Sequence, residues 1–178
     1  MGTDTTDLVV TNGFRIWQRS IPIGGSHFTK QLTNAMKLTF ATAEPLKRNA
    51  REAEDPKAVF QAMRPVFNDL VQELQRSIGY FRSIDRRAEI TQGVALGNAM
   101  RLPGLQPYIE KNLEIPIRKV QEFEHLTGSS VISTPKFKDN ILSFPVSYGL
   151  CIQGLGKGRL STNLSPRELV NARLIRHK

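Results

Sequence analysis

The sequence has few of the residues that build disulfides, zinc clusters or membrane helices. Cys151 is the one cysteine among 178 residues, which excludes an internal disulfide and a cysteine zinc cluster. The three histidines are scattered and predict no metal site. No apolar run approaches the roughly 18 residues that a membrane helix needs, and the first residues lack the basic and apolar segments of a signal peptide. We therefore expect a cytoplasmic protein with no bound metal and no direct membrane insertion.

The chain is basic, and the excess charge lies at its C-terminal end. The net charge is +9, and residues 157–178 contribute +5 of it, with six basic residues against Glu168. Such a tail can meet nucleic acid or anionic lipid. However, no aromatic residue interleaves its charges, as stacking on bases would favour. We favour a solvated or partner-bound extension and keep nucleic-acid binding as an alternative.

The N-terminal part predicts a hairpin followed by a helix. The β-rich runs 8–11 and 14–19 flank Asn12-Gly13, the strongest short signal for a hairpin. A helical pattern follows, because apolar residues recur at spacings of three and four at Phe28, Leu32, Ala35 and Met36.

The region up to residue 87 is predicted to be helical. Thr42 is a candidate N-cap for a second, short helix, with Pro45 in its first turn, where a missing N–H costs little. A long apolar stripe then runs from Val59 to Phe81 with helical spacing. Pro65 lies within this stripe and should kink or divide the helix.

The rest of the chain alternates between strands and helices. Residues 90–96 and 115–120 are typical of strands, with a helix over 105–112 between them. Residues 121–140 are predicted to be rich in loops. Residues 144–155 predict a helix that is apolar enough to be buried, its cysteine included. Strands interleaved with helices indicate an α/β fold, and we expect one mixed sheet that includes the hairpin.

A short helix is predicted in the basic tail. Ser165 is its N-cap, Pro166 its first residue, and Glu168 completes a capping box. A helix of about three turns is too short to be stable alone in water. We expect residues 159–178 to make few contacts with the rest of the chain.

Two N-terminal segments are rich in glycine and in small or hydroxyl residues. The first is rich in small and hydroxyl residues, and a turn of this kind presents backbone N–H groups and hydroxyls to phosphate oxygens. Its candidate residues are Gly2, Thr3, Asp4, Thr5 and Thr6. The second reads IPIGGSHFT over residues 21–29, where Gly24 and Gly25 let the backbone approach a ligand before a helix N-terminus that favours anions.

Two later segments complete the set. The third reads AEPLK over residues 43–47 and contains Glu44 and Lys47. The fourth reads GNAMRLPGL over residues 97–105, directly after a predicted strand, and its candidate residues are Gly97, Asn98, Ala99 and Met100. Glycine and proline punctuate most loops, so each segment alone is a weak signal. Four in one order are a specific pattern.

In this order the four segments resemble the second half of the actin-like ATPases, a group that includes actin, the DnaK chaperones, FtsA and PilM. Residues 74–81 and the LPGL of residues 102–105 are most similar to the PilM family. The resemblance implies an α/β, ribonuclease-H-like nucleotide-binding half over residues 1–158. Residues 1–26 and 88–158 would form a sheet subdomain and residues 27–87 an inserted helical subdomain.

The resemblance also implies roles for the candidate residues. Residues 2–6 would form a phosphate loop, Glu44 would bond the ribose, Lys47 would border the base, and residues 97–100 would form the adenosine loop. ATP would be the cofactor, with Mg in the full-length protein. The family's magnesium-holding Asp would fall just before Met1, so no metal ligand or catalytic residue is assigned here. Asn98 stands where the family has its second glycine.

The function implied is that of a cytoplasmic nucleotide-binding scaffold of type IV pilus assembly, or of a related secretion system. It would be peripheral at the inner membrane through its partners and would form a homo-oligomer. Those partners are other pilus assembly proteins and the N-terminal peptide of a PilN-like membrane protein, which residues 162–166 resemble; nucleic acid is not among them. The second half alone should not hydrolyse ATP, because catalysis needs groups from both halves. The alternative is a structural interaction domain of this fold that binds no nucleotide.

Overall fold

The computed structural model describes residues 1–159, 166 and 168. It begins with the antiparallel strands β1 (Thr6–Thr11) and β2 (Ile16–Ile21). The predicted hairpin is present, but its loop has the four residues between Thr11 and Ile16 rather than two. The Asn12 side chain explains this, because its Oδ1 accepts from the backbone N–H groups of Phe14 and Arg15 at 3.1 and 2.9 Å.

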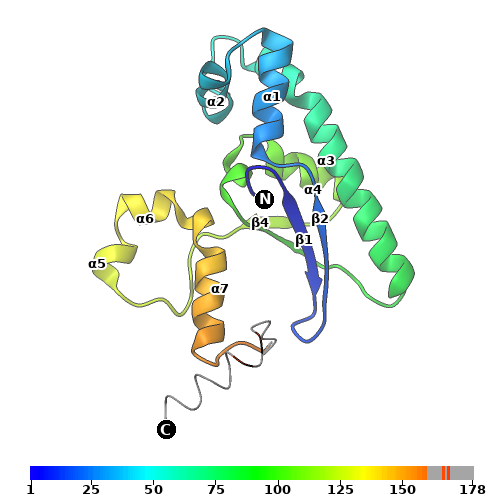
Figure 1. The fold of residues 1–178 in the computed structure, drawn as a ribbon, viewed down its shortest axis with the longest axis vertical. Coiled ribbons are helices and arrows are strands. Elements are labelled where there is room, and N and C mark those ends of the chain that lie inside the picture. The colour runs from blue at the N-terminus through cyan, green and yellow to red at the C-terminus, as the bar shows by residue number, and fades with distance from the viewer. Residues whose placement is uncertain (160–165, 167, 169–178) are drawn as a thin grey trace.

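Helices and short strands follow the hairpin (Figure 1). In chain order they are α1 (Gly25–Met36), α2 (Phe40–Arg48), α3 (Pro56–Ile84), β3 (Gly93–Ala95), η1 (Asn98–Arg101), α4 (Leu105–Leu113), β4 (Ile117–Lys119), α5 (Ser129–Ile132), α6 (Pro135–Asp139), η2 (Ile141–Ser143) and α7 (Pro145–Gly154). Figure 1 shows α1 and α2 above the hairpin, α3 along one side of it, and α5 to α7 on the opposite side.

The strands form two separate sheets in the described part of the chain. β1 pairs with β2, and β3 pairs in parallel with β4. The expectation of one mixed sheet that includes the hairpin is wrong for the described residues. β3 and β4 are only three residues long, and they pair with each other and not with the hairpin. The segment before β1 nevertheless bonds to the residue after β3, since the Met1 nitrogen donates to the Leu96 carbonyl at 2.7 Å.

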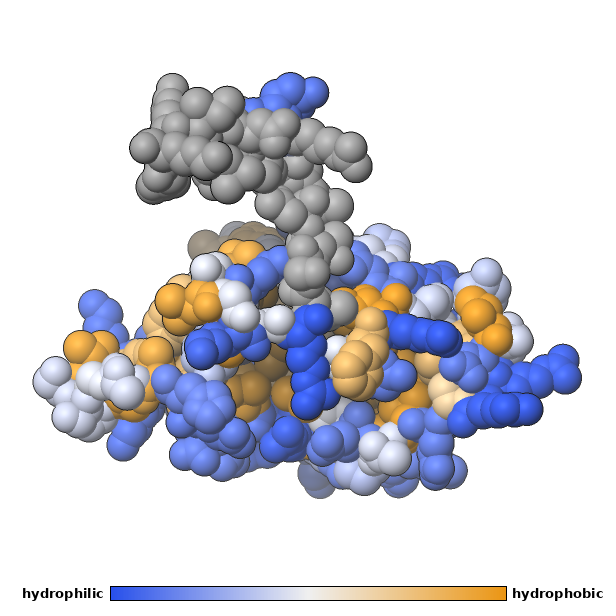
Figure 2. Space-filling model, turned by 90° about the horizontal axis from the view of Figure 1, so that it is seen from below, coloured by the Kyte–Doolittle hydropathy of each residue, from blue (hydrophilic) through white to orange (hydrophobic). Residues whose placement is uncertain are grey.

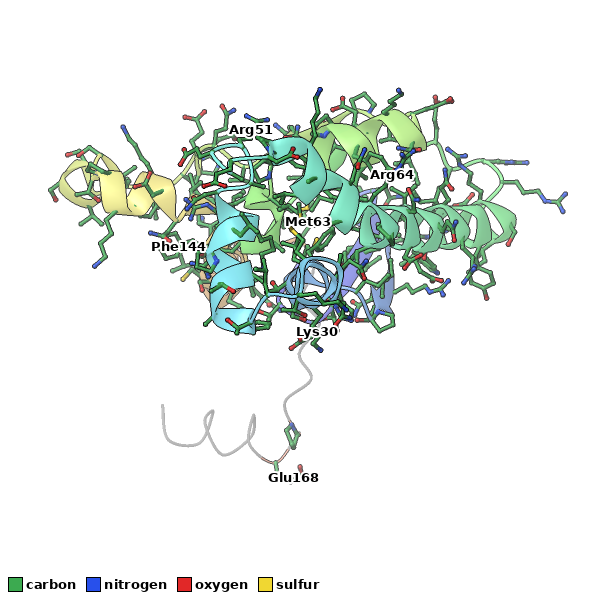
Figure 3. All side chains as sticks on the ribbon, turned by 90° about the horizontal axis from the view of Figure 1, so that it is seen from above. Lys30, Arg51, Met63, Arg64, Phe144 and Glu168 are labelled. Carbon is green, nitrogen blue, oxygen red and sulfur yellow. The ribbon has the colours of Figure 1, made fainter. Side chains whose placement is uncertain are left out.

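The core lies between α1, α3 and α4. The side chains with no exposed surface there include Phe28, Leu32, Met63, Leu70 and Leu105. Figure 3 shows Met63 among the helices, whereas its neighbour Arg64 lies at the surface. Each such side chain contributes about 1.5–3 kcal/mol through burial. This core fixes α1 against α3, and α1 carries the glycine segment of the candidate site.

The long helix was predicted correctly, but its proline does not divide it. α3 runs without interruption for 29 residues, past Pro65. Both Pro65 and Gln61, whose carbonyl loses its helical partner, are exposed. Water can therefore satisfy that carbonyl, which makes the proline tolerable.

The start of α2 differs from the prediction. Thr39, not Thr42, is the N-cap, and its Oγ1 accepts from the backbone N–H of Thr42 at 3.3 Å. Pro45 consequently lies inside the helix rather than in its first turn. It is exposed there, so the freed carbonyl one turn earlier can face solvent.

The region after β4 also differs from the prediction. Residues 121–140 contain the short helices α5 and α6. α7 buries none of its residues, leaving Val146 72% and Leu150 63% exposed, and Cys151 is exposed as well. The prediction of a buried helix is therefore wrong for the described residues, because their contacts with α7, such as the Phe123 ring 4.5 Å from the Tyr148 ring, leave every residue of α7 at least partly exposed. Apolar surface is visible on the underside of the molecule in Figure 2.

The last two predictions concern the basic tail and membrane-spanning helices. The prediction for residues 159–178 falls almost entirely outside the described residues. Arg159 is described, and its guanidinium carbon lies 5.4 Å from the centre of the Phe14 ring at the hairpin tip. Within the described residues, none of the helices combines the length and the apolar character needed to span a membrane.

Candidate functional site

The four predicted segments meet around Gly25. A Cβ atom placed on this glycine would lie 3.3 Å from the Ala99 Cβ, 3.7 Å from the Gly2 carbonyl oxygen and 3.9 Å from the Lys47 Nζ. Gly2, Gly25, Lys47 and Ala99 come from four different segments of the sequence. The fold therefore brings all four segments within contact distance at the first turn of α1.

An open cavity of about 1190 Å³ lies at this junction. A volume of this size accommodates a ligand as large as a nucleotide. The predicted site residues that line it are Gly2, Thr3, Gly25, Glu44, Lys47, Gly97, Asn98 and Ala99. The far wall is formed by η2 and the start of α7, including Ser143 and Val146.

The other predicted site residues do not line the cavity. They are Asp4, Thr5, Thr6, Gly24 and Met100. Asp4 accepts a hydrogen bond from the Ser26 hydroxyl at 2.7 Å, and Thr6 donates to the Ile23 carbonyl at 2.6 Å. Met100 belongs to the core. Asp4, Thr6 and Met100 therefore contribute to the packing around the cavity and not to its lining.

The N-terminus of α1 is already bonded to the N-terminal loop. The backbone N–H groups of Gly25 and Ser26 donate to the carbonyls of Gly2 and Thr3 at 3.0 and 2.7 Å. Gly24 makes this contact possible, since a Cβ there would lie 2.4 Å from the Thr3 oxygen. These two N–H groups are therefore not free for phosphate, contrary to the expectation that the helix N-terminus itself receives the anion.

Glu44 and Lys47 lie at the centre of a hydrogen-bonded cluster. The Lys47 Nζ donates to the Gly25 carbonyl at 3.0 Å, the Thr29 hydroxyl at 2.8 Å and the Glu44 Oε2 at 2.7 Å. Thr29 Oγ1 lies 2.6 Å from the same Oε2, and Arg48 Nε donates to the Glu44 Oε1 at 3.0 Å. The cluster joins the last turns of α2 to the first turns of α1.

The cluster holds Glu44 in its charged form. Burial opposes ionisation, but hydrogen bonds from Lys47, Thr29 and Arg48, together with the charge of Lys47, outweigh it. The pKa of Glu44 is lowered from 4.5 to about 2. At neutral pH this side chain is a carboxylate that lines the cavity, and carboxylates accept hydrogen bonds from hydroxyl groups.

The loop at residues 97–100 forms another part of the cavity wall, next to η2. Gly97 has a φ of +91°, and a Cβ there would lie 2.2 Å from the Met1 carbonyl oxygen. This backbone shape and close approach both require glycine. Asn98, in place of a second glycine, accepts a hydrogen bond through its Oδ1 from the Ser143 hydroxyl at 2.8 Å, which ties this loop to η2.

Sequence reasoning assigned no role to several residues in or next to the site, among them Thr29, Arg48 and Ser143. Thr29 lies behind the cavity, while Arg48 and Ser143 line it. Thr29 is the last residue of the second segment and lies one helical turn beyond Gly25, while Arg48 directly follows the third segment. The position of these polar side chains was a signal that could have identified them. Ser143 is 45 residues from its partner Asn98 and gave no signal. Among the described residues, no group of three or more His, Cys, Asp or Glu could hold a metal ion.

Comparisons with known proteins support the resemblance. A family model described as type IV pilus assembly protein PilM matches residues 1–155. Among solved structures, a chain of the "PilM-PilN type IV pilus biogenesis complex" has a TM-score of 0.73 and 26% identity, over 86% of this chain and 44% of that one. A search of curated proteins found no match.

A second solved structure is more distant. The ethanolamine utilization protein EutJ from Carboxydothermus hydrogenoformans has a TM-score of 0.54 and 19% identity, over 67% of this chain and 41% of that one. This likeness shows the fold alone. This chain thus spans less than half the length of either neighbour.

These neighbours have the actin-like ATPase fold, so the predicted α/β, actin-like fold is confirmed. The division at residue 158 and the separate helical subdomain over residues 27–87 stay predictions. The family match extends over nearly the whole described chain, and this chain belongs to the type IV pilus assembly protein PilM family.

Proposed function

We propose that this chain is the nucleotide-binding second half of a PilM-like scaffold in type IV pilus assembly. The observation that carries the proposal is the meeting of four separate segments at Gly25, around a cavity lined by the carboxylate of Glu44. An adenine nucleotide would place its ribose against Glu44 and its base along residues 97–99. A cavity of about 1190 Å³ with a carboxylate in its lining supports the choice of a ligand that carries ribose hydroxyls.

The described residues do not form a binding site for a magnesium ion by themselves. The described residues offer no cluster of metal ligands, so a magnesium ion would depend on ATP phosphates and on groups outside this set. We assign no catalytic residue here and expect no ATP hydrolysis by this chain alone. In the whole protein the role is that of a platform, peripheral at the inner membrane, which binds a PilN-like partner. A PilM–PilN complex among the structural neighbours supports that choice of partner.

Calorimetric titration of ADP into the chain tests the nucleotide site. We expect Glu44→Gln to weaken ADP binding by about 1–3 kcal/mol, because a neutral amide replaces a charged acceptor. Glu124→Gln is the matched control, since Glu124 is exposed and does not line the cavity. Equal affinities for the wild type and Glu44→Gln would contradict the ribose assignment.

A second candidate is a structural interaction domain that binds no nucleotide. Two observations favour it: the α1 N–H groups are bonded to Gly2 and Thr3, and Asn98 occupies a glycine position. Under this alternative the wild type gives no heat on titration with ADP. The variant Asn98→Gly restores the glycine of the family pattern. If this variant binds ADP and the wild type does not, the Asn98 side chain is what prevents nucleotide binding.

A further inference from the structure

Thr29 lies behind the candidate site rather than in it. Its side chain is fully buried, with 0% of its surface exposed, and it does not line the cavity. Lys47 and Glu44 do line it, with 12% and 26% of their side chains exposed. A buried hydroxyl needs partners, and those of Thr29 are the two charged groups of the site.

The donors and acceptors of the cluster fix the direction of each bond. An ammonium group has three protons and no acceptor, so Lys47 donates all three, to the Gly25 carbonyl, Thr29 and Glu44. Thr29 therefore accepts from Lys47 and has one proton left. Its 2.6 Å contact with Glu44 Oε2 is the shorter of its two choices, the other being 3.4 Å to the Gly25 carbonyl.

This arrangement divides the two oxygens of Glu44 between two tasks. Oε2 accepts from both Thr29 and Lys47, which lie behind it. Among the described residues, Oε1 accepts only from Arg48, whose side chain is 73% exposed. A carboxylate oxygen accepts about two hydrogen bonds, so Oε1 keeps acceptor capacity on the side of the solvent-exposed partner.

We infer that Thr29 is a positioning residue, which together with Lys47 locks one oxygen of the Glu44 carboxylate and thereby presents the other to the hydroxyl groups of a ribose-containing ligand. The inference rests on the proposed nucleotide site and refines it. Lys47 lines the cavity, but its three protons are used within the protein, so we assign it no hydrogen bond to the base.

The charged groups around Glu44 are consistent with this role. Lys47 and Arg48, both from α2, are the cations bonded to it. The titratable side chains of α1 are His27 and Lys30, and neither forms an ion pair with Glu44 within the described chain. The hydrogen bonds from Lys47 and Thr29 lower the pKa of Glu44 against the effect of burial.

The test compares Thr29→Val, which keeps the shape but removes the hydroxyl, with Thr29→Ser, which restores it. NMR titration of the Glu44 carboxyl carbon should show a raised pKa in Thr29→Val and the wild-type value in Thr29→Ser. ADP affinity by calorimetry should fall about tenfold in Thr29→Val and recover in Thr29→Ser. If Thr29→Val does not fold, Thr29→Cys provides the comparison, because a thiol is a weak donor.

The matched control lies one turn further along the same helix. Thr33 donates to the Lys30 carbonyl at 2.6 Å and has no bond to Glu44, so Thr33→Val should change neither readout. An unchanged Glu44 titration in Thr29→Val would overturn the inference. Should the wild type bind no ADP, the proposed function fails, and the carboxyl titration alone then decides whether Thr29 positions Glu44.

Discussion

Gly24 packs so closely against the N-terminal loop that no side chain fits there. A Cβ would lie 2.4 Å from the Thr3 oxygen and 2.6 Å from the Asp4 nitrogen, both backbone atoms. We expect Gly24→Ala to lower the free energy of unfolding by about 1–3 kcal/mol, because backbone must move to relieve the clash. Urea denaturation followed by circular dichroism measures the change.

Gly79 provides the matched control for that substitution. It is exposed on α3, and an added Cβ would meet nothing within 4 Å. Gly79→Ala should stabilise the chain by about 0.5–1 kcal/mol, because alanine loses less entropy in a helix. If Gly24→Ala stabilised the chain as Gly79→Ala is expected to do, the close contact at Gly24 would not exist in solution.

At the scale of single residues, the sequence identified side chains that line the cavity but not the hydrogen bonds that each of them makes. Motif spacing led to Glu44 and Lys47, and both line the cavity. The motif alone suggested that Lys47 reaches the ligand. Only distances show that its three protons are already used, one of them by Thr29.

At the scale of elements, α7 contributes no buried residue to the described core. Leu150 is 63% exposed on α7, whereas Leu70 on α3 is fully buried. We expect Leu150→Ala to change the free energy of unfolding by less than about 0.5 kcal/mol. Leu70→Ala should cost about 2–5 kcal/mol, because it leaves a cavity in the core.

Thermal or urea denaturation of the two leucine variants measures this difference directly. A cost for Leu150→Ala close to that of Leu70→Ala would mean that α7 is buried in the chain in solution. Apolar surface of the kind that α7 exposes marks interaction sites in many soluble proteins.

The same elements show which predictions the sequence supports. α3 was predictable because its apolar residues repeat with helical spacing over many turns. α7 was not, since its apolar residues have no preferred face, and composition alone suggested burial. The cap of α2 was ambiguous because Thr39 and Thr42 are both capping residues, and their hydroxyls lie 3.1 Å apart.

At the scale of the whole molecule, the cavity draws its walls from the length of the described chain. Its lining extends from Met1 through the first turns of α1 and the last turn of α2 to Val146 at the start of α7. Sequence order predicted that the four motifs would meet, but not that η2 and α7 would face them. Contacts between segments so far apart depend on packing that no local pattern encodes.

Folding stability should depend on pH through Glu44. Its pKa is about 2 in the folded chain, against an ordinary value of 4.5, so the unfolded chain binds this proton more readily. The stabilisation is complete above about pH 4.5 and disappears as the pH falls towards 2. Because Glu44 is only partly buried and solvent screens its ion pairs, we expect a contribution of about 1 kcal/mol at neutral pH, well below the full value of the shift.

The free energy of unfolding of the wild type and of Glu44→Gln, measured by urea denaturation between pH 2 and pH 7, isolates this contribution. Other carboxyl groups titrate in the same range, but they are common to both proteins and cancel in the difference. We expect the difference to be constant above about pH 4.5 and to shrink below it. Glu124→Gln, at an exposed position, should give a difference near zero throughout. A wild-type advantage over Glu44→Gln that persists unchanged to pH 2 would mean that the cluster around Glu44 does not hold its charge.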